Sequence, residues 1–295
     1  MARGGVVVIV VRCDACGGSV AFDAERARAQ CLFCAAVALE PLPLDQPPPP
    51  PERVVPFAID DAAAREGFAK WCRGSWWRPA ALRDVALQLQ PLWLPAWRAR
   101  AEVELHWAGL VAARTRSGRR PRAGVDRGAA EAMIPASLGV SPAELAQAAP
   151  FPPASRSWSG HDGAIARELP SLTEAGARTR VLATLEATRL REVAAREHLH
   201  DAGGTARLHA LATSLESLPV YIGAFRFRDR PWRVVINGAT GKLVGRAPID
   251  RVKLAIAIAI GVLLLLAFAW WSRPPDQPGE PEDDAQPSVA RRRSS

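Results

Sequence analysis

The chain has 295 residues and a formal net charge of +8, and nearly all of its cations are arginine because Lys70, Lys242 and Lys253 are the only lysines. With 26 prolines and many alanines, this indicates a compositional bias of the source, so the charge alone does not predict a polyanionic partner. Two CxxC pairs and one further cysteine argue against a secreted disulfide scaffold and favour a metal site in a reducing compartment.

The first apolar run is Val6–Val11, which is β-branched throughout. It is too short for the core of a signal peptide, and no small-residue cleavage site follows it. We therefore expect a strand that leads into Cys13 rather than a targeting segment.

Four cysteines with paired spacing follow this strand. Cys13 and Cys16 form the first CxxC pair, and Cys31 and Cys34 form the second after 14 intervening residues. Each pair holds two thiolates in a tight turn, and two facing turns complete a closed tetrahedral set, which predicts a structural zinc ribbon over residues 1–40. Iron in the same geometry and a redox dithiol are the alternatives. So short a module cannot bury a core, and the metal is expected to supply most of its folding free energy.

Residues 41–53 are expected to form a proline-rich linker, because Pro47–Pro51 is an uninterrupted run of prolines. Such a run favours a polyproline II rod and cannot join a helix or a central strand. A semi-rigid spacer is the favoured interpretation, and a ligand for an SH3-type domain is the alternative.

Residues 54–250 have the pattern of a mixed α+β domain with antiparallel strands. Asp60 or Asp61 can cap a first helix over Ala62–Arg73. A proline in the first turn predicts a second helix over about Pro79–Leu89.

A half-buried strand is predicted next, because apolar residues alternate with charged ones over Ala99–Trp107. The loop that should follow it, Arg114–Arg122, holds five arginines in nine residues. A solvated hairpin tip is the favoured interpretation. A patch for anionic lipid or nucleic acid is the alternative, with lipid the better of the two.

Three helices are predicted in the middle of the domain. Ala129–Ser137 has helical composition, and a capping box with proline at the first helical position opens a short helix over Ser141–Ala149. Residues 150–175 read as a loop. Glu174–Leu199 has apolar residues at helical spacing, and Gly203-Gly204 is expected to end this helix.

The last soluble segment has strand signals throughout. An Asn237-Gly238 pair between apolar runs predicts a hairpin, because both central positions of a type I′ turn need positive φ. The string that ends at Lys242 is not a phosphate-binding loop, because Ile236 stands where its first glycine should be. The predicted strands are Leu218–Phe227, Trp232–Ile236 and Leu243–Gly245.

No nucleophile elbow or catalytic triad is recognisable, so we expect a protein that is not an enzyme. The Trp-rich region 71–107 is expected to be mostly core, with stacking on sugars or bases as the alternative. A second metal held by His198, His200 and His209 is disfavoured, because the three are scattered across the end of a predicted helix.

Several separated stretches together resemble a bacterial family of zinc-ribbon proteins that often carry late membrane spans. Its members are described as containing a transcription-factor-IIB-type ribbon, or are sometimes named after a primosomal helicase. This chain has one span rather than several, and it has no helicase motor motifs. The resemblance implies an architecture and no reaction. It is carried by the cysteine pairs, Val54–Phe57, Phe68, Trp71, Trp93–Trp97, Leu218–Tyr221, Arg230–Gly238, Thr240–Lys242 and Pro248.

The run Leu254–Trp271 contains no charged, amide or hydroxyl side chain. As a helix it would be roughly 27 Å long, close to the thickness of a bilayer's hydrocarbon core, which predicts a transmembrane helix over residues 251–272 rather than a buried core helix. Cations at 246, 251 and 253 precede it and only Arg273 follows closely, so the positive-inside rule predicts cytoplasmic residues 1–253. The tail 273–295 is expected to be disordered and outside.

These features lead to one functional hypothesis and one alternative. The hypothesis is a single-pass protein of the inner membrane, non-catalytic, whose zinc ribbon and α+β domain face the cytoplasm as an interaction or scaffold module for an unknown protein partner. The alternative is a membrane-tethered nucleic-acid-binding protein that uses the ribbon and the Arg114–Arg122 loop.

Overall fold

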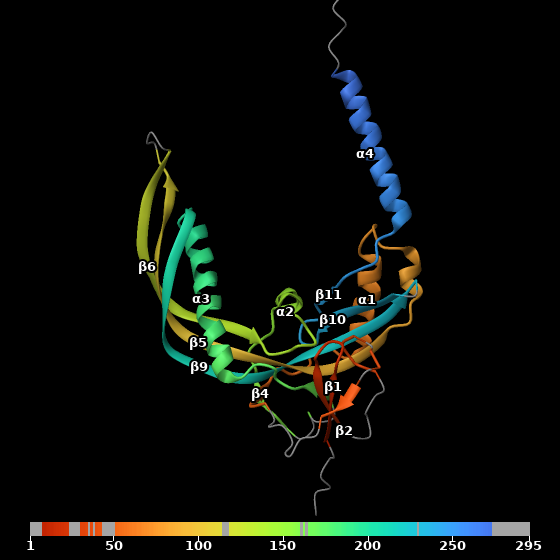
Figure 1. The fold of residues 1–295 in the computed structure, drawn as a ribbon, viewed down its shortest axis with the longest axis horizontal. Helices are drawn as coiled ribbons and strands as arrows, with labels where there is room; N and C mark the ends of the chain where they lie inside the picture. Colours follow the sequence, from red (N-terminus) through yellow and green to blue (C-terminus); the bar gives the residue numbers. More distant parts are fainter. Residues whose placement is uncertain are drawn as a thin grey trace, which may run out of the picture. The chain divides into compact units, whose positions relative to one another are not determined.

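The computed structural model describes residues 8–23, 30–34, 36–37, 39–42, 51–113, 118–159, 162, 165–228 and 230–272 (Figure 1). The predicted linker run at 43–50 and the predicted tail at 273–295 lie outside these residues. The chain divides into two compact units, Met1–Pro248 and Ile249–Ser295, which are described separately. The mixed α+β class that the sequence predicts is confirmed, whereas the predicted domain boundaries stay a prediction.

The first unit is built on two long antiparallel strands, β5 (Gln88–Ala112) and β9 (His200–Phe227). They pair from Gln88 opposite Ala224 to Leu110 opposite His200, with register shifts at two points. A third long strand, β6 (Arg119–Pro135), pairs with the other edge of β5. The strand predicted at 99–107 is therefore confirmed as part of β5, which pairs with both β6 and β9.

The helix α3 (Glu174–Arg196) lies in the curve of this three-stranded sheet (Figure 1). The Thr173 side chain accepts a hydrogen bond from the backbone N–H of Gly176 and caps its first turn. The apolar stripe of α3 packs on alternate residues of the sheet to form one hydrophobic cluster. Its buried members are Ala99, Ala101, Val103, Leu105, Trp107, Ala132, Ile134, Ala177, Val181, Leu185, Val193 and Ala206.

The other halves of β5 and β9 join a second group of elements. These are β10 (Arg230–Asn237), β11 (Leu243–Gly245), the helix α1 (Asp61–Arg73) and the short 3-10 helix η2 (Ala80–Asp84). β10 pairs with β9 and β11 pairs with β10, both antiparallel. Here α1 and η2 bury Phe68, Cys72 and Leu82 against Phe225, Phe227 and Val234.

The two cysteine pairs lie in a small β module that belongs to the same sheet. The module consists of β1 (Val8–Cys13), β2 (Ser19–Asp23) and β3 (Leu39–Pro41), with β1 between the other two. β2 pairs with β8 (Ala166–Glu168), and β8 pairs in parallel with β5. We call the described residues of 8–42 the cysteine ribbon. Two short strands, β4 (Arg53–Val54) and β7 (Arg156–Ser157), and the helix α2 (Pro142–Ala148) complete the unit.

The second unit contains the helix α4 (Arg251–Trp271), which the Asp250 side chain caps by accepting hydrogen bonds from the backbone of Val252 and Lys253. None of its residues is buried. α4 is the one described helix that is long and apolar enough to cross a membrane. This confirms a long apolar helix where the sequence predicts one. Membrane association and orientation stay predictions.

Several predicted elements are confirmed. α1 begins at Asp61 with Asp60 as its cap, and α3 covers most of the predicted Glu174–Leu199 helix. Both hydrogen bonds of the predicted capping box are present at α2, between Ser141 and Glu144. Local capping chemistry was sufficient to predict α1 and α2, and the helical spacing of apolar residues was sufficient for α3.

The prediction of a helix at Ala129–Ser137 is wrong, because these residues continue β6 and the segment after it. Ala, Glu and Met favour helices in isolation, but pairing with β5 overrides that preference, with Glu131 opposite Arg100 and Met133 opposite Arg98. The predicted Pro79–Leu89 helix shortens to η2, because Gln88 and Leu89 already pair with β9.

Two glycine-based predictions are also corrected. Gly203 and Gly204 do not end α3, which stops at Arg196; they lie in β9, where a Cβ on Gly204 would come within 2.7 Å of the His106 carbonyl oxygen. The hairpin between β10 and β11 is confirmed, but the positive φ is at Gly241 (76°) rather than at the Asn-Gly pair. Asn237 instead organises the loop by accepting hydrogen bonds from the backbone of residues 239 and 240.

A buried ion pair lies where β5, β6 and β9 meet. Arg98 is 5% exposed and donates a 2.6 Å hydrogen bond to Glu216, whose side chain is 4% exposed. The same guanidinium bonds the carboxylate of Glu131, 38% exposed, and the carbonyl oxygen of Pro152. Removing one partner of such a pair costs more than the intact pair contributes, because the remaining charge stays buried.

We therefore predict that Glu216→Gln lowers the free energy of unfolding by about 3 kcal/mol, because the Arg98 charge keeps only a partly exposed partner. The matched variant Glu131→Gln removes the exposed partner and should cost about 1 kcal/mol or less. Urea unfolding of the full chain in detergent measures both values. Equal losses for the two variants would show that burial does not set the strength of this pair.

Candidate metal centre

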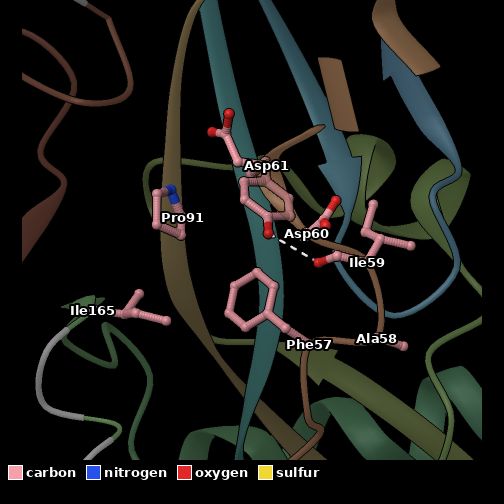
Figure 2. Close-up of a pocket in the computed structure, with 8 residues that line it drawn as sticks. Phe57, Ala58, Ile59, Asp60, Asp61, Pro91 and Ile165 are labelled. Atoms are coloured by element: carbon pink, nitrogen blue, oxygen red, sulfur yellow. Dashed lines mark hydrogen bonds between the residues drawn. The ribbon is translucent and has the colours of Figure 1, made fainter. Parts of the chain in front are cut away.

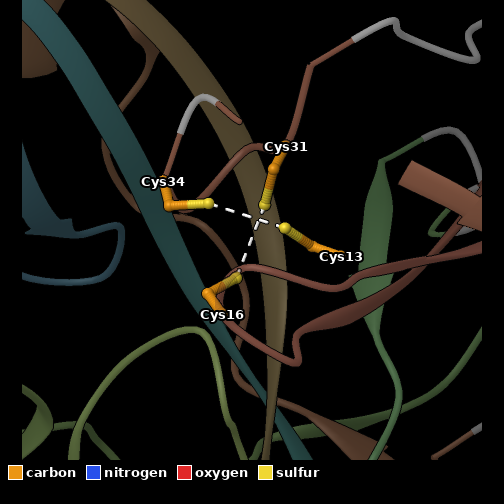
Figure 3. A group of neighbouring side chains, drawn as sticks. All are labelled: Cys13, Cys16, Cys31 and Cys34. Carbon is orange, nitrogen blue, oxygen red and sulfur yellow. Dashed lines mark hydrogen bonds between the residues drawn. The ribbon is translucent and has the colours of Figure 1, made fainter. Parts of the chain in front are cut away.

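The four predicted cysteine ligands lie together in the structure (Figure 3). Their sulfur atoms are all within 4.8 Å of one another, with 3.6 Å between those of Cys13 and Cys34 and 3.7 Å between those of Cys16 and Cys31. A metal with sulfur ligands at about 2.3 Å in a tetrahedron separates its ligands by about 3.8 Å. Two of the sulfur separations therefore match a tetrahedral metal site, and the predicted ligand set is the one that the described residues bring together.

Each cysteine pair is held in a turn with the same backbone hydrogen bonding. The N–H of Cys13 donates to the carbonyl of Gly18 at 2.9 Å, and the N–H of Cys31 donates to the carbonyl of Ala36 at 2.8 Å. Both bonds close a six-residue turn around a CxxC. Gly17 has φ of 75°, which explains why a glycine follows the first pair.

Backbone donors point at the sulfur atoms from within these turns. The N–H of Phe33 lies 3.4 Å from the Cys31 sulfur, an arrangement that stabilises a thiolate. Burial raises the pKa of Cys16 and of Cys31 above the usual thiol range. Burial also acts on Cys13, but backbone and thiol hydrogen bonds outweigh it and lower the pKa of that group. A metal ion must displace protons from the thiols of Cys16 and Cys31, so metal binding should strengthen as pH rises.

The ribbon is packed into the core of the first unit. Cys13, Cys31 and Phe33 belong to a buried cluster that also contains Leu92 and Leu94 of β5. The ring of Phe33 lies against Gly18 and Gly139, and a Cβ on Gly139 would overlap with it. One side of the cysteine cluster is therefore packed into the main hydrophobic core, while Cys34 stays exposed.

Arg233 of β10 ties the second cysteine turn to this core. Its guanidinium donates hydrogen bonds to the carbonyl oxygens of Phe33 (3.2 Å) and Gly139 (2.6 Å), and to both carboxylate oxygens of Glu144 at 2.6 and 2.8 Å. Glu144 is also the capping-box residue of α2. One arginine thus connects the ribbon, the loop before α2 and the last strands of the sheet. Arg233 lies in the Arg230–Gly238 stretch that supports the family resemblance, but no pattern in the sequence indicates these contacts.

A buried carboxyl group supports the same region. Glu168 is 3% exposed, and its Oε1 accepts hydrogen bonds from the backbone N–H groups of Leu138 (2.8 Å) and Gly139 (2.9 Å). Burial raises the pKa of Glu168, which favours its neutral form. Because β8 pairs with β2, this residue fixes the loop that covers the cysteines.

The other predicted candidates do not form a site. His198, His200 and His209 are exposed, and the cysteine cluster is the group with metal-binding geometry among the described residues. Residues 114–117 of the arginine loop lie outside the described residues. The remaining loop arginines are in β6, where Arg119 pairs with Asp201 at 3.2 Å and Arg122 pairs with Glu197 at 2.8 Å.

A hollow of about 450 Å³ lies beside α1, apart from the cysteine cluster (Figure 2). Its aromatic wall is Phe57 and Tyr221, whose rings are 5.1 Å apart, and the Tyr221 hydroxyl donates to the carbonyl of Ile59 at 2.9 Å. Asp60 and Asp61 stand at its edge, but the first caps α1 and the second pairs with Arg65 at 2.5 Å. Burial, with a smaller effect from these carboxylates, raises the pKa of Tyr221. The hollow therefore presents a neutral phenol rather than an activated nucleophile.

Comparison with known proteins finds no relative. No family model matches the chain, and it has no significant match to a curated protein or a solved structure. The resemblance to bacterial zinc-ribbon membrane proteins therefore stays a prediction from sequence.

The cluster predicts that the purified chain holds one metal ion and that Cys13→Ser loses it, because three sulfur atoms no longer close the tetrahedron. Cys72→Ser is the matched control, since Cys72 lies on α1, is buried against η2, β9 and β10, and is not in the cysteine cluster. Elemental analysis after gel filtration measures the metal content. A Cys13→Ser chain that keeps its full equivalent would contradict the assignment.

Proposed function

We propose that this protein is a membrane-anchored, non-catalytic zinc-ribbon protein whose first unit acts as an interaction or scaffold module on the cytoplasmic side. The observation that carries the proposal is the four-sulfur cluster, of which Cys13 and Cys31 are buried in the core and Cys34 is exposed. With four protein ligands the metal has no open position for substrate or water, so it supports structure rather than chemistry.

Zinc is the metal that this ligand set supports best. Four thiolates in a tetrahedron suit Zn²⁺, which has no redox chemistry and no geometric preference that the protein must satisfy. Iron in the same set is the alternative. A chain that also carries a free, buried Cys72 fits a reducing compartment, in which thiols stay available for metal.

The helix α4 supports membrane anchoring. It extends from Arg251 to Trp271 with no buried residue, and its apolar face covers the whole circumference. A helix that is hydrophobic all round is stable only inside a protein core or in lipid. Arg251 and Lys253 at its start support a cytoplasmic first unit by the positive-inside rule.

An interaction role follows from the surface of the first unit. Its large polar face on β5, β6 and β9 is a mosaic of opposite charges, such as Glu104 with Arg127 at 2.9 Å and Arg100 with Glu131 at 2.8 Å. Such a mosaic binds a complementary protein surface by matching charges rather than by attracting any polyanion. In this proposal the cysteine cluster stabilises the fold that carries this surface and takes no part in a reaction.

We predict that the purified chain carries one equivalent of zinc, colourless in solution, and that α4 keeps it in the membrane fraction after alkaline carbonate. A visible thiolate-to-iron absorption band would favour iron instead. Recovery of the protein in the carbonate supernatant would show that α4 is not a membrane span.

Orientation is tested with single thiols added at the two ends. A thiol at Ser288 should react with an impermeant reagent on intact cells, and a thiol at Thr205, exposed on β9, should react only after lysis. Labelling of Thr205→Cys on intact cells would reverse the proposed topology.

Nucleic-acid binding by the arginines of 114–122 is the second proposal. The ion pairs of Arg119 and Arg122 with acidic residues reduce the charge available to phosphates. Binding, if present, should weaken steeply between low and moderate salt and fall in an Arg119→Gln, Arg120→Gln, Arg122→Gln variant. Absence of binding at low salt excludes this function.

A further inference from the structure

Two adjacent tryptophans stand on the surface of the first unit. Trp76 is 61% exposed and Trp77 is 43% exposed, with their ring centroids 5.1 Å apart in an edge-to-face arrangement. The other tryptophans of the region 71–107 are in or against the core, and Trp93 and Trp97 donate their indole N–H groups to backbone carbonyls. The prediction that this region is mostly core is confirmed, and Trp76 and Trp77 are the exceptions.

The loop that carries the pair has a defined conformation. The N–H of Gly74 donates to the Trp71 carbonyl, and the N–H of Arg78 donates to the Ser75 carbonyl, each at 3.1 Å. The Arg78 guanidinium also lies over the Trp71 ring, 4.1 Å from its centroid, and bonds the Trp71 carbonyl. The two indoles are thus presented by a folded turn at the end of α1.

The charges around the pair are mainly positive. Residues 70–84 contain one acid, Asp84, against four cations, and three of these cations are exposed at the surface. The cations are Lys70, Arg73, Arg78 and Arg83. Tryptophan with arginine and lysine is the composition that proteins place in the headgroup layer of a membrane, where the indole is half in lipid and the cations meet anionic phosphates.

The chain leaves the first unit from the same end of the sheet. α1 contacts β11, and the last residue of that strand, Gly245, pairs with Val234, which packs in one cluster with Phe68 and Cys72 of α1. Five residues lie between Gly245 and Arg251, the first residue of α4. Fully extended, they span at most about 20 Å. A membrane entered by α4 is therefore within reach of the loop at the end of α1.

We propose that Trp76 and Trp77 form a second membrane contact, with the indoles in the headgroup layer of the leaflet that α4 enters and the neighbouring cations on anionic lipid. This inference rests on the proposed membrane anchoring by α4. The contact would be weak for a free domain, but tethering makes it intramolecular, with an effective concentration on the order of millimolar. Its consequence is a fixed face of the first unit toward the membrane, so that the three-stranded sheet is presented to partners in one orientation.

The test uses the full chain in vesicles, with a small fluorescent amino acid at position 75 beside the pair or at the exposed position 205 on β9 as the matched control. One vesicle set contains phosphatidylcholine alone, and the other adds phosphatidylglycerol; both carry nitroxide-labelled lipid. The expected result is a blue shift and quenching at position 75, stronger with phosphatidylglycerol, and neither change at position 205. Replacing both tryptophans, Trp76→Ser with Trp77→Ser, should abolish the quenching at position 75.

Carbonate extraction of the same vesicles separates the two proposals. If the chain resists extraction while position 75 stays in water, the second contact is overturned and the anchor stands. That result would indicate that the tryptophan pair faces a protein partner. A chain that carbonate removes refutes the anchor and this inference together. Persistence of quenching in the double variant also overturns the role of the tryptophans.

Discussion

The hydrogen-bonded pairing of β5 with β9 is the constraint on which the rest of the first unit depends. These strands are neighbours over almost their full lengths although more than eighty residues separate their nearest ends in the sequence. Hydrophobic clusters on both halves of the pair use its alternate residues, one against α3 and others against α1, α2 and the ribbon. A change of register by one residue would turn these apolar side chains to solvent, so the pairing fixes both the core and the position of the cysteines.

The cysteine ribbon gains from this arrangement and contributes to it. A ribbon of this size buries too little apolar surface to fold by itself, but here two of its cysteines and Phe33 lie in the main core. A metal bound by the four cysteines would share its binding free energy with the sheet through β2, β8 and Arg233. Through this coupling, a metal without an open coordination position would stabilise the whole unit.

The residues that support the family resemblance have structural tasks in this chain. Asn237 donates to the carbonyls of Ala148 and Pro150, and Lys242 donates to the carbonyl of Ala149, so the β10–β11 loop holds the end of α2. The ring of Phe57 lies where a Cβ on Gly238 would be. The sequence stretches that carry the resemblance therefore supply contacts between segments that are distant in the sequence.

The sequence by itself determined the features that depend on neighbours along the chain. Cysteine spacing predicted the ligand set, and an unbroken apolar run predicted α4. Side-chain caps at Asp60 and Ser141 predicted two helices, and apolar residues at helical spacing predicted α3. Only the tertiary structure decided that residues 129–135 are strand, that Arg233 joins the ribbon to the core, and that Trp76 and Trp77 are exposed. The physical reason is that strand pairing and burial depend on partners far away in the sequence, and local propensity cannot report them.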